Sequence, residues 1–387
     1  MHLDIHLGRP LERSELLKLL PALLCVPQVS FGATRDVLSC DLGEAGAQAF
    51  DARLIPALDR LELTWQKRDP IALPRRLYES ADAVVTLQCS GAPDPASIVA
   101  LASDLLAGET SSIRGLRSIG AVEGAPAVFE IYLQGVEHLE TARERLAALR
   151  ERGSVDINLT HADLKRPRRR LIVFDMDSTL IDCEVIDELA ARAGVGEEVA
   201  AITARAMRGE LDFRSSFRER MARLKGLSAS VLEDIASQLP IMPGAEALLR
   251  ALCGQGHYTA ILSGGFDYFA REVQARLGIH EVHANRLQLA DGALTGEVEG
   301  AIVDGARKVE LLEALAREQG FDLRDTVAVG DGANDIPMLT RAGLGVAFHA
   351  KPLVRERAPC AVSYADLTGL LGLLGDSSAS PEYARSG

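Results

Sequence analysis

The sequence has no cysteine pair at the spacing of a metal-binding or redox motif. Its six cysteines are scattered through 387 residues, with no CxxC pair and no zinc spacing. We therefore expect reduced thiols in a cytoplasmic protein. The N-terminus, MHLDIHLGRP, has no basic segment followed by an apolar one, and predicts no signal peptide. No apolar stretch is long enough to span a bilayer, so we expect no membrane partner.

The sequence also lacks net positive charge. The formal net charge of -13 argues against a nucleic-acid partner and against binding to anionic membranes. An anionic substrate would need positive charge concentrated at its own site. Hydrophobic residues make up 47% and charged residues 25%, which is typical of a soluble protein, and the length suits two or three domains.

The first 163 residues predict a duplicated α+β arrangement. The pattern of strands and helices in residues 81–163 is βαββαβ, which is ferredoxin-like, and residues 1–80 show a fainter version. The predicted strands are 83–89, 112–120, 126–134 and 153–159, with helices at 95–107 and 139–149. In the first copy we predict strands at 2–7, 37–42 and 62–65, with helices at 12–24 and 45–61.

The remainder of the chain predicts a parallel sheet. The basic run 164–170, LKRPRRR, is one short cluster on an acidic chain, and we interpret it as a solvated linker. In residues 171–375 apolar segments alternate with amphipathic helices, which is typical of an α/β domain. Residues 376–387 lack apolar anchors and predict a disordered tail. The predicted strands of this domain are 171–174, 258–262, 326–330 and 344–348.

One connection in this domain is too long for a simple crossover. Asp175 and Ser263 are 88 residues apart, whereas a βαβ unit takes roughly 30. The excess, about 184–240, is rich in helical pattern. We therefore predict a small helical insertion over the carboxyl end of the sheet.

Two carboxylates follow the first strand of this domain directly. Residues 171–182 read LIVFDMDSTLID, in which four apolar residues end at Asp175, with Asp177 two positions on. A short apolar run of this kind predicts a buried strand of a parallel sheet. Ligands of such sheets bind beyond the carboxyl ends of the strands, so these aspartates are candidate functional groups.

Two further strands end in groups that can complete a metal and phosphate site. Ser263 opens the run Ser-Gly-Gly, and Asp331 lies in GDGAND, residues 330–335. Asp175, Asp177 and Asp331 would form the cluster of hard oxygen ligands that Mg²⁺ prefers. Without a cation, these carboxylates would repel one another and any phosphate.

Phosphate oxygens need donors as well. Ser263, Gly264 and Gly265 are predicted to open a helix, whose free N–H groups and dipole favour an anion, and glycine allows close approach. Lys308, at the start of another helix, adds a compact positive charge. Each motif alone is weak, because a lone DxD occurs in unrelated metal sites, Ser-Gly-Gly is most often a turn, and a helix lysine is most often solvated. Their joint occurrence beside apolar strands favours a site for metal and phosphate.

With these motifs, residues 171 to about 372 resemble the haloacid-dehalogenase-like hydrolases, and among them the phosphoserine phosphatases. The resemblance rests on DMDST, which includes Thr179, on LSGGF, on Lys308 and on GDGAND. It implies a Rossmannoid parallel sheet with a small helical cap, and a phosphoric monoester hydrolase that works through an aspartyl-phosphate.

The resemblance also implies a role for each motif residue. Asp175 would be the nucleophile and Asp177 the general acid and then the general base. Mg²⁺ would be held by Asp175, the main-chain carbonyl of Asp177 and Asp331. The residues expected to bind phosphoryl oxygens or support the site are Ser263, Gly264, Gly265, Lys308, Thr179, Asn334, which contacts substrate or phosphate, and Asp335, which orients the metal's surroundings.

Substrate choice is expected from the helical insertion. By the same resemblance Glu184 would bind an amino group and Arg220 a carboxylate, with Met207 and Phe213 closing over the substrate. Phe213 and Arg220 are seven residues apart, so they share a helix face. The implied substrate is O-phospho-L-serine, with serine and phosphate as products.

The N-terminal region resembles ACT domains, which implies homodimerisation or binding of serine as a regulator. Two alternatives stay open at this point. One is a phosphatase for another small phosphomonoester, or a phosphotransferase that passes the phosphoryl group to an alcohol. The other is an amino-acid-sensing regulatory protein with a vestigial phosphatase.

Overall fold

A computed structural model of the protein describes residues 2–23, 28–31, 37–41, 50–68, 77–89, 112–119, 127–136, 138–150 and 155–375. The chain forms two compact units, which we call unit 1 and unit 2. Unit 1 comprises residues 1–167 and 368–387, and unit 2 comprises residues 168–367. The predicted helix at 95–107 and the predicted tail at 376–387 lie outside the described residues.

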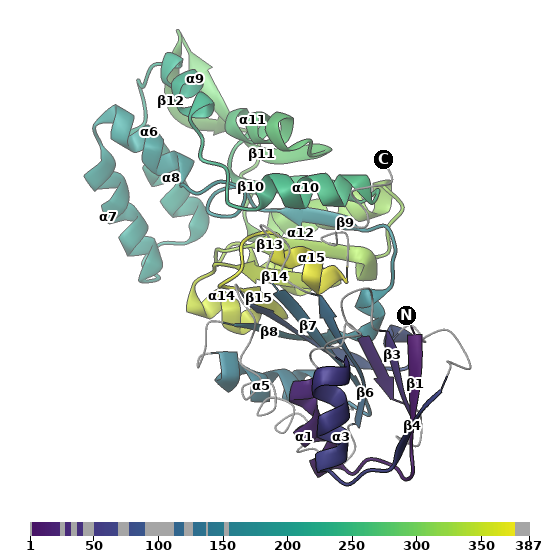
Figure 1. Ribbon diagram of the computed structural model, residues 1–387. Helices are drawn as coiled ribbons and strands as arrows, with labels where there is room; N and C mark the ends of the chain where they lie inside the picture. The colour runs from purple at the N-terminus through teal and green to yellow at the C-terminus, as the bar shows by residue number, and fades with distance from the viewer. Residues whose placement is uncertain are drawn as a thin grey trace. The chain divides into compact units, whose positions relative to one another are not determined.

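Unit 1 contains an eight-stranded antiparallel sheet in the order β4-β1-β3-β2-β6-β7-β5-β8 (Figure 1). The two halves have the same internal order of first to fourth strand, and they join where β2 pairs with β6. This repeated order supports the predicted duplication, and the assignment of the halves to the ACT family stays a prediction. The strands are β1 (His2–Leu7), β2 (Gln28–Phe31), β3 (Val37–Asp41), β4 (Trp65–Arg68), β5 (Ala83–Cys89), β6 (Ser112–Ile119), β7 (Ala127–Gln134) and β8 (Asp156–His161).

One face of this sheet packs on helices. Alternate residues of each strand point to the same face, so Val85 and Leu87 of β5 join Phe129 and Ile131 of β7 in one apolar core. The same core includes Leu146 of a flanking helix. The helical segments of unit 1 before its last helix are α1 (Arg13–Leu23), η1 (Phe50–Leu54), α3 (Ile55–Arg60), η2 (Leu77–Glu79), α5 (Leu139–Arg150) and η3 (Ala162–Lys165).

The opposite face of β5 and β7 carries buried polar side chains, among them Gln88 and Glu130, and the last described helix, α15 (Gly369–Leu374), packs against β5 and η3. Lys165 Nζ lies 2.7 Å from Glu130 Oε1 and donates a 2.6 Å hydrogen bond to the carbonyl of Gly372. Gln88 Nε2 donates to the carbonyl of Gly369. Burial of a charged pair is tolerated here because both members are hydrogen-bonded. A segment from the end of the chain therefore completes unit 1.

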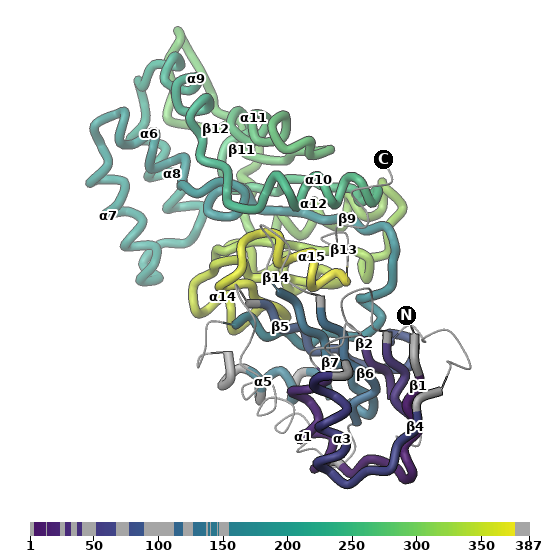
Figure 2. Tube along the Cα trace, viewed as in Figure 1, coloured from purple at the N-terminus to yellow at the C-terminus, as the bar shows by residue number. Residues whose placement is uncertain are grey.

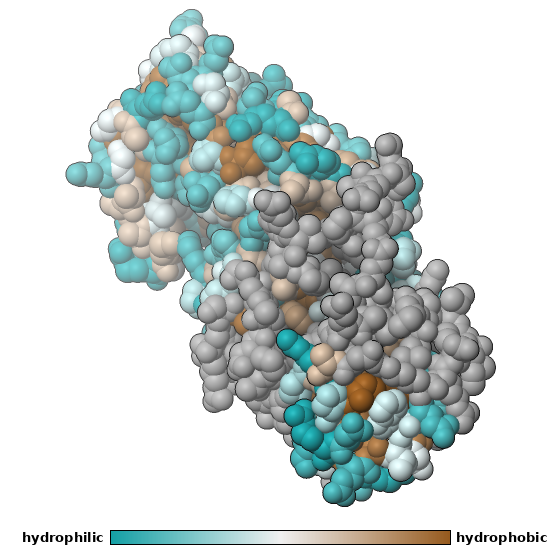
Figure 3. Space-filling model, in the orientation of Figure 1, coloured by the Kyte–Doolittle hydropathy of each residue, from teal (hydrophilic) through white to brown (hydrophobic). Residues whose placement is uncertain are grey.

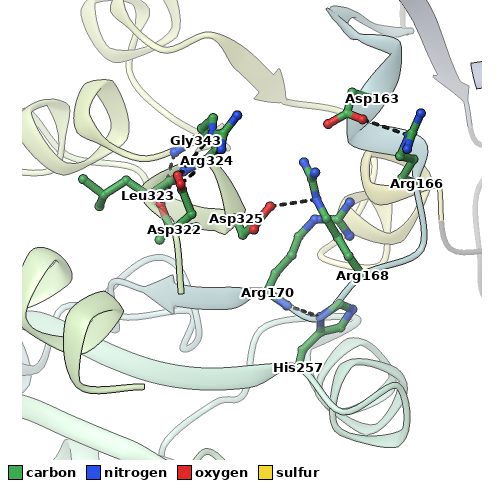
Figure 4. Close-up of polar contacts among 11 residues, drawn as sticks. Asp163, Arg166, Arg168, Arg170, His257, Asp322, Leu323, Arg324, Asp325 and Gly343 are labelled. Carbon is green, nitrogen blue, oxygen red and sulfur yellow. Dashed lines mark hydrogen bonds and ion pairs between the residues drawn. The ribbon is translucent and has the colours of Figure 1, made fainter. Parts of the chain in front are cut away.

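The basic run 164–170 contains the boundary between the two units, as expected of a linker, but it is solvated only in part, which corrects the sequence-based interpretation. Lys165 is only 3% exposed and Arg170 only 1%. Arg168 Nε lies 2.8 Å from Asp325 Oδ1, and the backbone N–H of Arg170 donates to His257 Nδ1 (Figure 4). The partners come from distant parts of the chain, so the local sequence gives no sign of them.

Unit 2 contains a seven-stranded sheet in the order β12-β11-β10-β9-β13-β14-β15, parallel except for β12. The central strand β9 is fully buried, which explains its unbroken apolar sequence. The strands are β9 (Leu171–Phe174), β10 (Tyr258–Phe266), β11 (Glu281–Ala290), β12 (Ala293–Glu299), β13 (Thr326–Gly330), β14 (Leu344–Phe348) and β15 (Cys360–Val362).

The predicted insertion at about 184–240 is helical and forms a cap. Its helices are gathered at one end of unit 2 (Figures 1 and 2). They are α6 (Val185–Ala193), α7 (Gly196–Met207), α8 (Phe213–Arg223) and α9 (Ser230–Ser237). The other helical segments of unit 2 are α10 (Ala245–Gly254), α11 (Asp267–Leu277), α12 (Gly305–Glu318), η4 (Leu323–Asp325), α13 (Ile336–Arg341) and α14 (Pro352–Arg357).

The visible surface of unit 2 is mostly hydrophilic, with hydrophobic residues in small patches (Figure 3). Single exposed apolar residues are normal in proteins and carry no argument. Among the described residues, no helix has the length and apolar character needed to cross a membrane.

Candidate active site

The carboxyl ends of three neighbouring strands bring the predicted motifs together. β9 lies between β10 and β13, and the backbone continues its pairing at Asp175, whose N–H donates to the carbonyl of Val329 at 2.9 Å. Ser263 and Gly264 come from β10, and Asp331 directly follows β13. The structure thus places all three motifs at the same edge of the sheet, as their positions after apolar strands predict.

The run Ser263-Gly264-Gly265 does not open a helix, which corrects the prediction from the sequence. β10 continues to Phe266 and α11 begins only at Asp267. The N–H of Gly265 is taken by Ser263 Oγ at 2.9 Å, and the carbonyl of Gly264 accepts from Asn285 Nδ2 at 2.8 Å. These bonds hold the run in the strand, so its N–H groups are not those of a helix N-terminus.

Gly265 has a packing role at the site. A Cβ atom at this position would lie 2.3 Å from Asp177 Oδ2. Glycine therefore lets the carboxylate of Asp177 lie directly against the end of β10.

A cluster of carboxylates forms the floor of the site. Oxygens of Asp175, Asp331 and Asp335 lie within 4.8 Å of one another. The side chain of Asp335 thus belongs to this cluster, although the resemblance implies for it only an orienting role. Lys308 Nζ lies 2.9 Å from Asp175 Oδ1 and 2.6 Å from Asp335 Oδ1. The backbone N–H of Gly332 donates to Asp335 Oδ2 at 2.9 Å.

One ammonium group does not neutralise this cluster. Burial, together with the charges of Asp175 and Asp335, raises the pKa of Asp331 to about 8. Burial and Asp175 likewise raise the pKa of Asp335 to about 7, although Lys308 opposes the change. Grouped carboxylate oxygens with excess negative charge are the donor set of a hard divalent cation. The residues present therefore fit Mg²⁺.

Asp177 lies beside this cluster in a different environment. Its Oδ1 accepts a 3.0 Å hydrogen bond from the backbone N–H of Val185, at the start of α6. Burial, followed by the charges of Glu184 and Asp175, raises the pKa of Asp177 well above its usual value. A carboxyl group that retains its proton suits a general acid.

A cavity of about 580 Å³ opens between the sheet edge and the cap. Phe213 closes over the sheet edge, because a Cβ atom on Gly264 would lie 3.0 Å from its ring. The predicted residues that line the cavity are Asp175, Asp177, Glu184, Met207, Phe213, Arg220, Gly264, Gly265, Asp331 and Asn334. Four other predicted residues, Thr179, Ser263, Lys308 and Asp335, are 0% exposed and lie behind this lining.

Cationic and anionic groups face the cavity from the cap. Arg220 Nε is buried and has no hydrogen-bond partner. The side chain of Glu184 is oriented by a 2.8 Å hydrogen bond from Ser178 Oγ. A guanidinium with an unsatisfied nitrogen opposite a carboxylate is suited to a ligand that carries both charges.

Some lining residues were not predicted. Asp187, in the first turn of α6, is three residues after Glu184, and Lys351 follows the carboxyl end of β14. The position of Lys351 after a parallel strand is a signal that the sequence does contain. No sequence pattern marks Asn285, because it belongs to no motif. Its side chain binds the carbonyl of Gly264 and the N–H of Val303, which are distant in the sequence.

Comparison with known proteins places this chain in a family. Residues 172–340 match the family described as haloacid dehalogenase-like hydrolase. A Mycobacterium tuberculosis relative is 41% identical over 308 residues, which is 76% of this chain and 75% of the relative. The chain belongs to the haloacid dehalogenase-like hydrolases.

The particular relatives share one name. The Mycobacterium protein is a phosphoserine phosphatase, and so is a Streptomyces coelicolor protein that is 48% identical over 246 residues, 64% of this chain and 60% of the relative. This chain therefore spans less than two thirds of the Streptomyces protein. A solved structure described as a phospho-aspartyl intermediate analogue of phosphoserine phosphatase is 45% identical, with a TM-score of 0.50, and covers 53% of this chain and 98% of its own.

Proposed function

We propose that the protein is a phosphoserine phosphatase, which hydrolyses O-phospho-L-serine to L-serine and phosphate. The observation that carries this proposal is the cavity that Asp175 and Asp177 line together with Glu184 and with Arg220, whose Nε has no hydrogen-bond partner. The names of the relatives support the same activity.

In the first half of the reaction Asp175 attacks phosphorus in line. Both Lys308 Nζ and the N–H of Met176 contact Oδ1 of Asp175, so Oδ2 is the oxygen that attacks. A bond forms from Oδ2 to phosphorus and the bond from phosphorus to the serine oxygen breaks. Asp177 gives its proton to that oxygen as serine leaves.

In the second half, water hydrolyses the aspartyl-phosphate. Asp177, now a carboxylate, takes a proton from the water that attacks phosphorus, and the bond to Asp175 Oδ2 breaks. Ser263 and Gly264 hold the phosphoryl oxygens, with Lys308 beside them. Because Ser263 Oγ accepts from Gly265, its own proton is available for donation.

A divalent cation fits the floor of the site. Asp175, Asp331 and the carbonyl of Asp177 would hold Mg²⁺, with Asp335 beside them. Bound there, Mg²⁺ supplies positive charge that offsets the phosphoryl oxygens and the crowded carboxylates.

The cap supplies the choice of substrate. Arg220 binds the carboxylate of phosphoserine through a charge-assisted hydrogen bond, and Glu184 binds its ammonium group. Met207 and Phe213 cover the reacting groups and exclude water, and Asn334 contacts the phosphate. Unit 1 has a separate role in this proposal, which is to join two copies of the protein in the cytoplasm and to bind serine as a regulator.

The test is phosphate release from O-phosphoserine and from p-nitrophenyl phosphate, each with and without Mg²⁺. Arg220→Ala should raise the KM for phosphoserine by about 10- to 100-fold, as expected for a lost hydrogen bond to a charged group, and should change p-nitrophenyl phosphate hydrolysis far less. The control is Arg218→Ala, an exposed arginine on the same helix α8.

Three outcomes contradict the proposal. If Arg220→Ala lowered activity on both substrates equally, Arg220 would not bind the substrate carboxylate. An absence of Mg²⁺-dependent release would favour the amino-acid sensor. Phosphate release that falls as added alcohol rises would identify a phosphotransferase.

A further inference from the structure

A charged contact joins the cap of unit 2 to its core. Arg214 Nε, in the first turn of α8, lies 2.5 Å from Asp304 Oδ2, at the start of α12. The side chain of Asp304 is only 15% exposed, whereas that of Arg214 is 54% exposed. Other ion pairs of the cap, such as Arg223 with Glu198, connect cap helices to each other.

The position of Arg214 has no local explanation. The N-terminus of a helix carries partial positive charge, so an arginine in the first turn opposes the helix dipole. The end of α8 is already capped by Asp212, which accepts a 2.7 Å hydrogen bond from the N–H of Ser215. Arg214 therefore contributes to a contact between elements and not to the stability of its own helix.

The two carboxylate oxygens of Asp304 accept hydrogen bonds from different partners. Oδ1 accepts from the N–H of Arg307 at 2.9 Å and caps α12, while Oδ2 accepts from Arg214. One turn further along α12 is Lys308, whose ammonium contacts Asp175 and Asp335. The contact thus ties the cap to the helix that carries the buried lysine of the active site.

A second set of contacts lies between the cap and α12, around Gly264 near the end of β10. Asn285 donates to the carbonyl of Gly264, and its Oδ1 accepts from the N–H of Val303 at 2.8 Å. Val303 precedes Asp304, and Phe213 precedes Arg214. A Cβ atom on Gly264 would lie 3.0 Å from the ring of Phe213 and 3.4 Å from the carbonyl of Val303. Cap, α12 and the end of β10 therefore meet at one place.

We propose that Arg214 and Asp304 form a latch that holds the cap closed and thereby positions Phe213 and Arg220 over the bound substrate. Both are positioning residues, because neither lines the cavity. The inference rests on the proposed function for its substrate, but the latch itself is a property of the cap. Loss of the latch should weaken substrate binding while the chemical step is preserved.

The kinetic test uses Arg214→Ala, Asp304→Asn and the double variant. Asparagine caps a helix as well as aspartate does, so Asp304→Asn removes the charge and keeps the cap of α12. Each single change should raise the KM for O-phosphoserine by about 2- to 5-fold, the range of a partly exposed ion pair, with kcat changed less than about 2-fold. The double variant should be no worse than either single variant, because both remove one interaction.

The matched control is Arg223→Ala, which breaks an ion pair inside the cap whose side chains are both more than half exposed. Its KM should equal that of the wild type. Arg214→Lys should restore part of the affinity. Additive effects in the double variant, or the same KM change in Arg223→Ala, would overturn the latch.

Hydrogen exchange gives a readout that needs no substrate. The amides of α8 should exchange faster in Arg214→Ala and Asp304→Asn than in the wild type, and the amides of α10 should not change. Unchanged exchange in α8 would overturn the latch even if phosphoserine is hydrolysed. Faster exchange without phosphoserine hydrolysis would support the latch and contradict only the proposed substrate.

Discussion

The two carboxylate oxygens of Asp175 have different surroundings. Oδ1 is held by Lys308 and by the N–H of Met176, and the residue lines the cavity. A side chain fixed through one oxygen presents the other in a defined direction, as the in-line attack proposed above requires.

We predict that Asp175→Asn abolishes turnover and preserves the fold. The amide oxygen can still accept the contacts to Oδ1, and the loss of one charge relieves Asp331 and Asp335. The rate of phosphate release should fall by about 10⁴-fold or more, as for other lost nucleophiles. The melting temperature should stay the same or rise. An undiminished rate would contradict the covalent mechanism, and circular dichroism checks that the fold is intact.

Among single residues, those that belong to motifs can be predicted from the sequence. Asp175, Ser263 and Asp331 follow apolar strands, so the geometry of a parallel sheet is enough to group them. Asn285 and Asp304 act on groups that are distant in the sequence, and no local pattern marks such contacts. Asp335 contacts Lys308, which is 27 residues away in the sequence.

Among the elements, the close approach of α15 to the sheet of unit 1 depends on Gly372. A Cβ atom there would lie 2.4 Å from Gln88 Nε2 and 3.0 Å from Val128 Cγ2. Gln88 is 0% exposed and bonded to the carbonyl of Gly369, so it has little room to move.

We predict that Gly372→Ala destabilises unit 1 by about 1–3 kcal/mol, the usual effect of overpacking. Unfolding of this unit can be followed by fluorescence, because the single tryptophan of the chain, Trp65, lies in unit 1. The control is Gly254→Ala at the end of α10 in unit 2, where a Cβ atom meets nothing within 4 Å, and calorimetry follows the unfolding of both variants. That change should be neutral or stabilising, because alanine favours helix. An equal loss of stability in both variants would contradict the packing argument.

The elements that the sequence predicts best are short, fully buried strands. The predictions for 171–174, 326–330 and 344–348 are confirmed to the residue. β11 and β12 were missed because their residues are half-exposed and polar, which hides the strand pattern. The strand predicted at 62–65 lies at 65–68, because a turn with Glu62 at positive φ intervenes.

For the molecule as a whole, acid should act on the two units in opposite directions when no divalent cation is bound. In folded unit 2 the pKa of Asp331 is about 8 and that of Asp335 about 7, against about 3.9 for an unfolded aspartate. At a pH between the unfolded and the folded pKa values, these carboxyl groups are protonated only in the folded state. The free energy of unfolding of unit 2 therefore rises as the pH falls from about 8 to about 4. Mg²⁺ should remove this dependence by replacing the protons.

In unit 1 acid should have the opposite effect and lower the stability of the folded state. Burial raises the pKa of Glu130, but Lys165 and Arg117 outweigh it and hold the pKa below its usual value. The stability that this carboxylate contributes is present above about pH 4.3, the value of an unfolded glutamate, and is lost as pH falls further. Glu130→Gln should flatten this loss and cost about 3–5 kcal/mol at neutral pH, because Lys165 is left buried without a counter-charge.

Thermal scans with EDTA or Mg²⁺ measure both effects. With EDTA, the unit 2 transition should rise by at least about 2–4 °C from pH 8 to pH 5.5, the shift that 1 kcal/mol gives in a unit of this size. With Mg²⁺ it should change little. The Trp65 transition of unit 1 should be flat in this range and fall below about pH 4.3. A unit 2 transition that falls on acidification with EDTA would contradict the carboxylate crowding.

The membership of the two units is the part of the architecture that the sequence did not indicate. Gln88 and Gly369, which are 281 residues apart, meet in unit 1, and the short apolar run of α15 resembles any buried helix. Periodicity tells that such a segment is buried but does not identify its partner.

The placement of α15 has a consequence for biosynthesis. Translation reaches residue 368 only after all 200 residues of unit 2 have been made, an interval of about 10–40 s at ordinary elongation rates. During that time the nascent sheet of unit 1 still lacks its covering helix, and at the end of it unit 2 has all its residues while unit 1 does not. The order of synthesis therefore lets unit 2 begin to fold before unit 1 has all its residues.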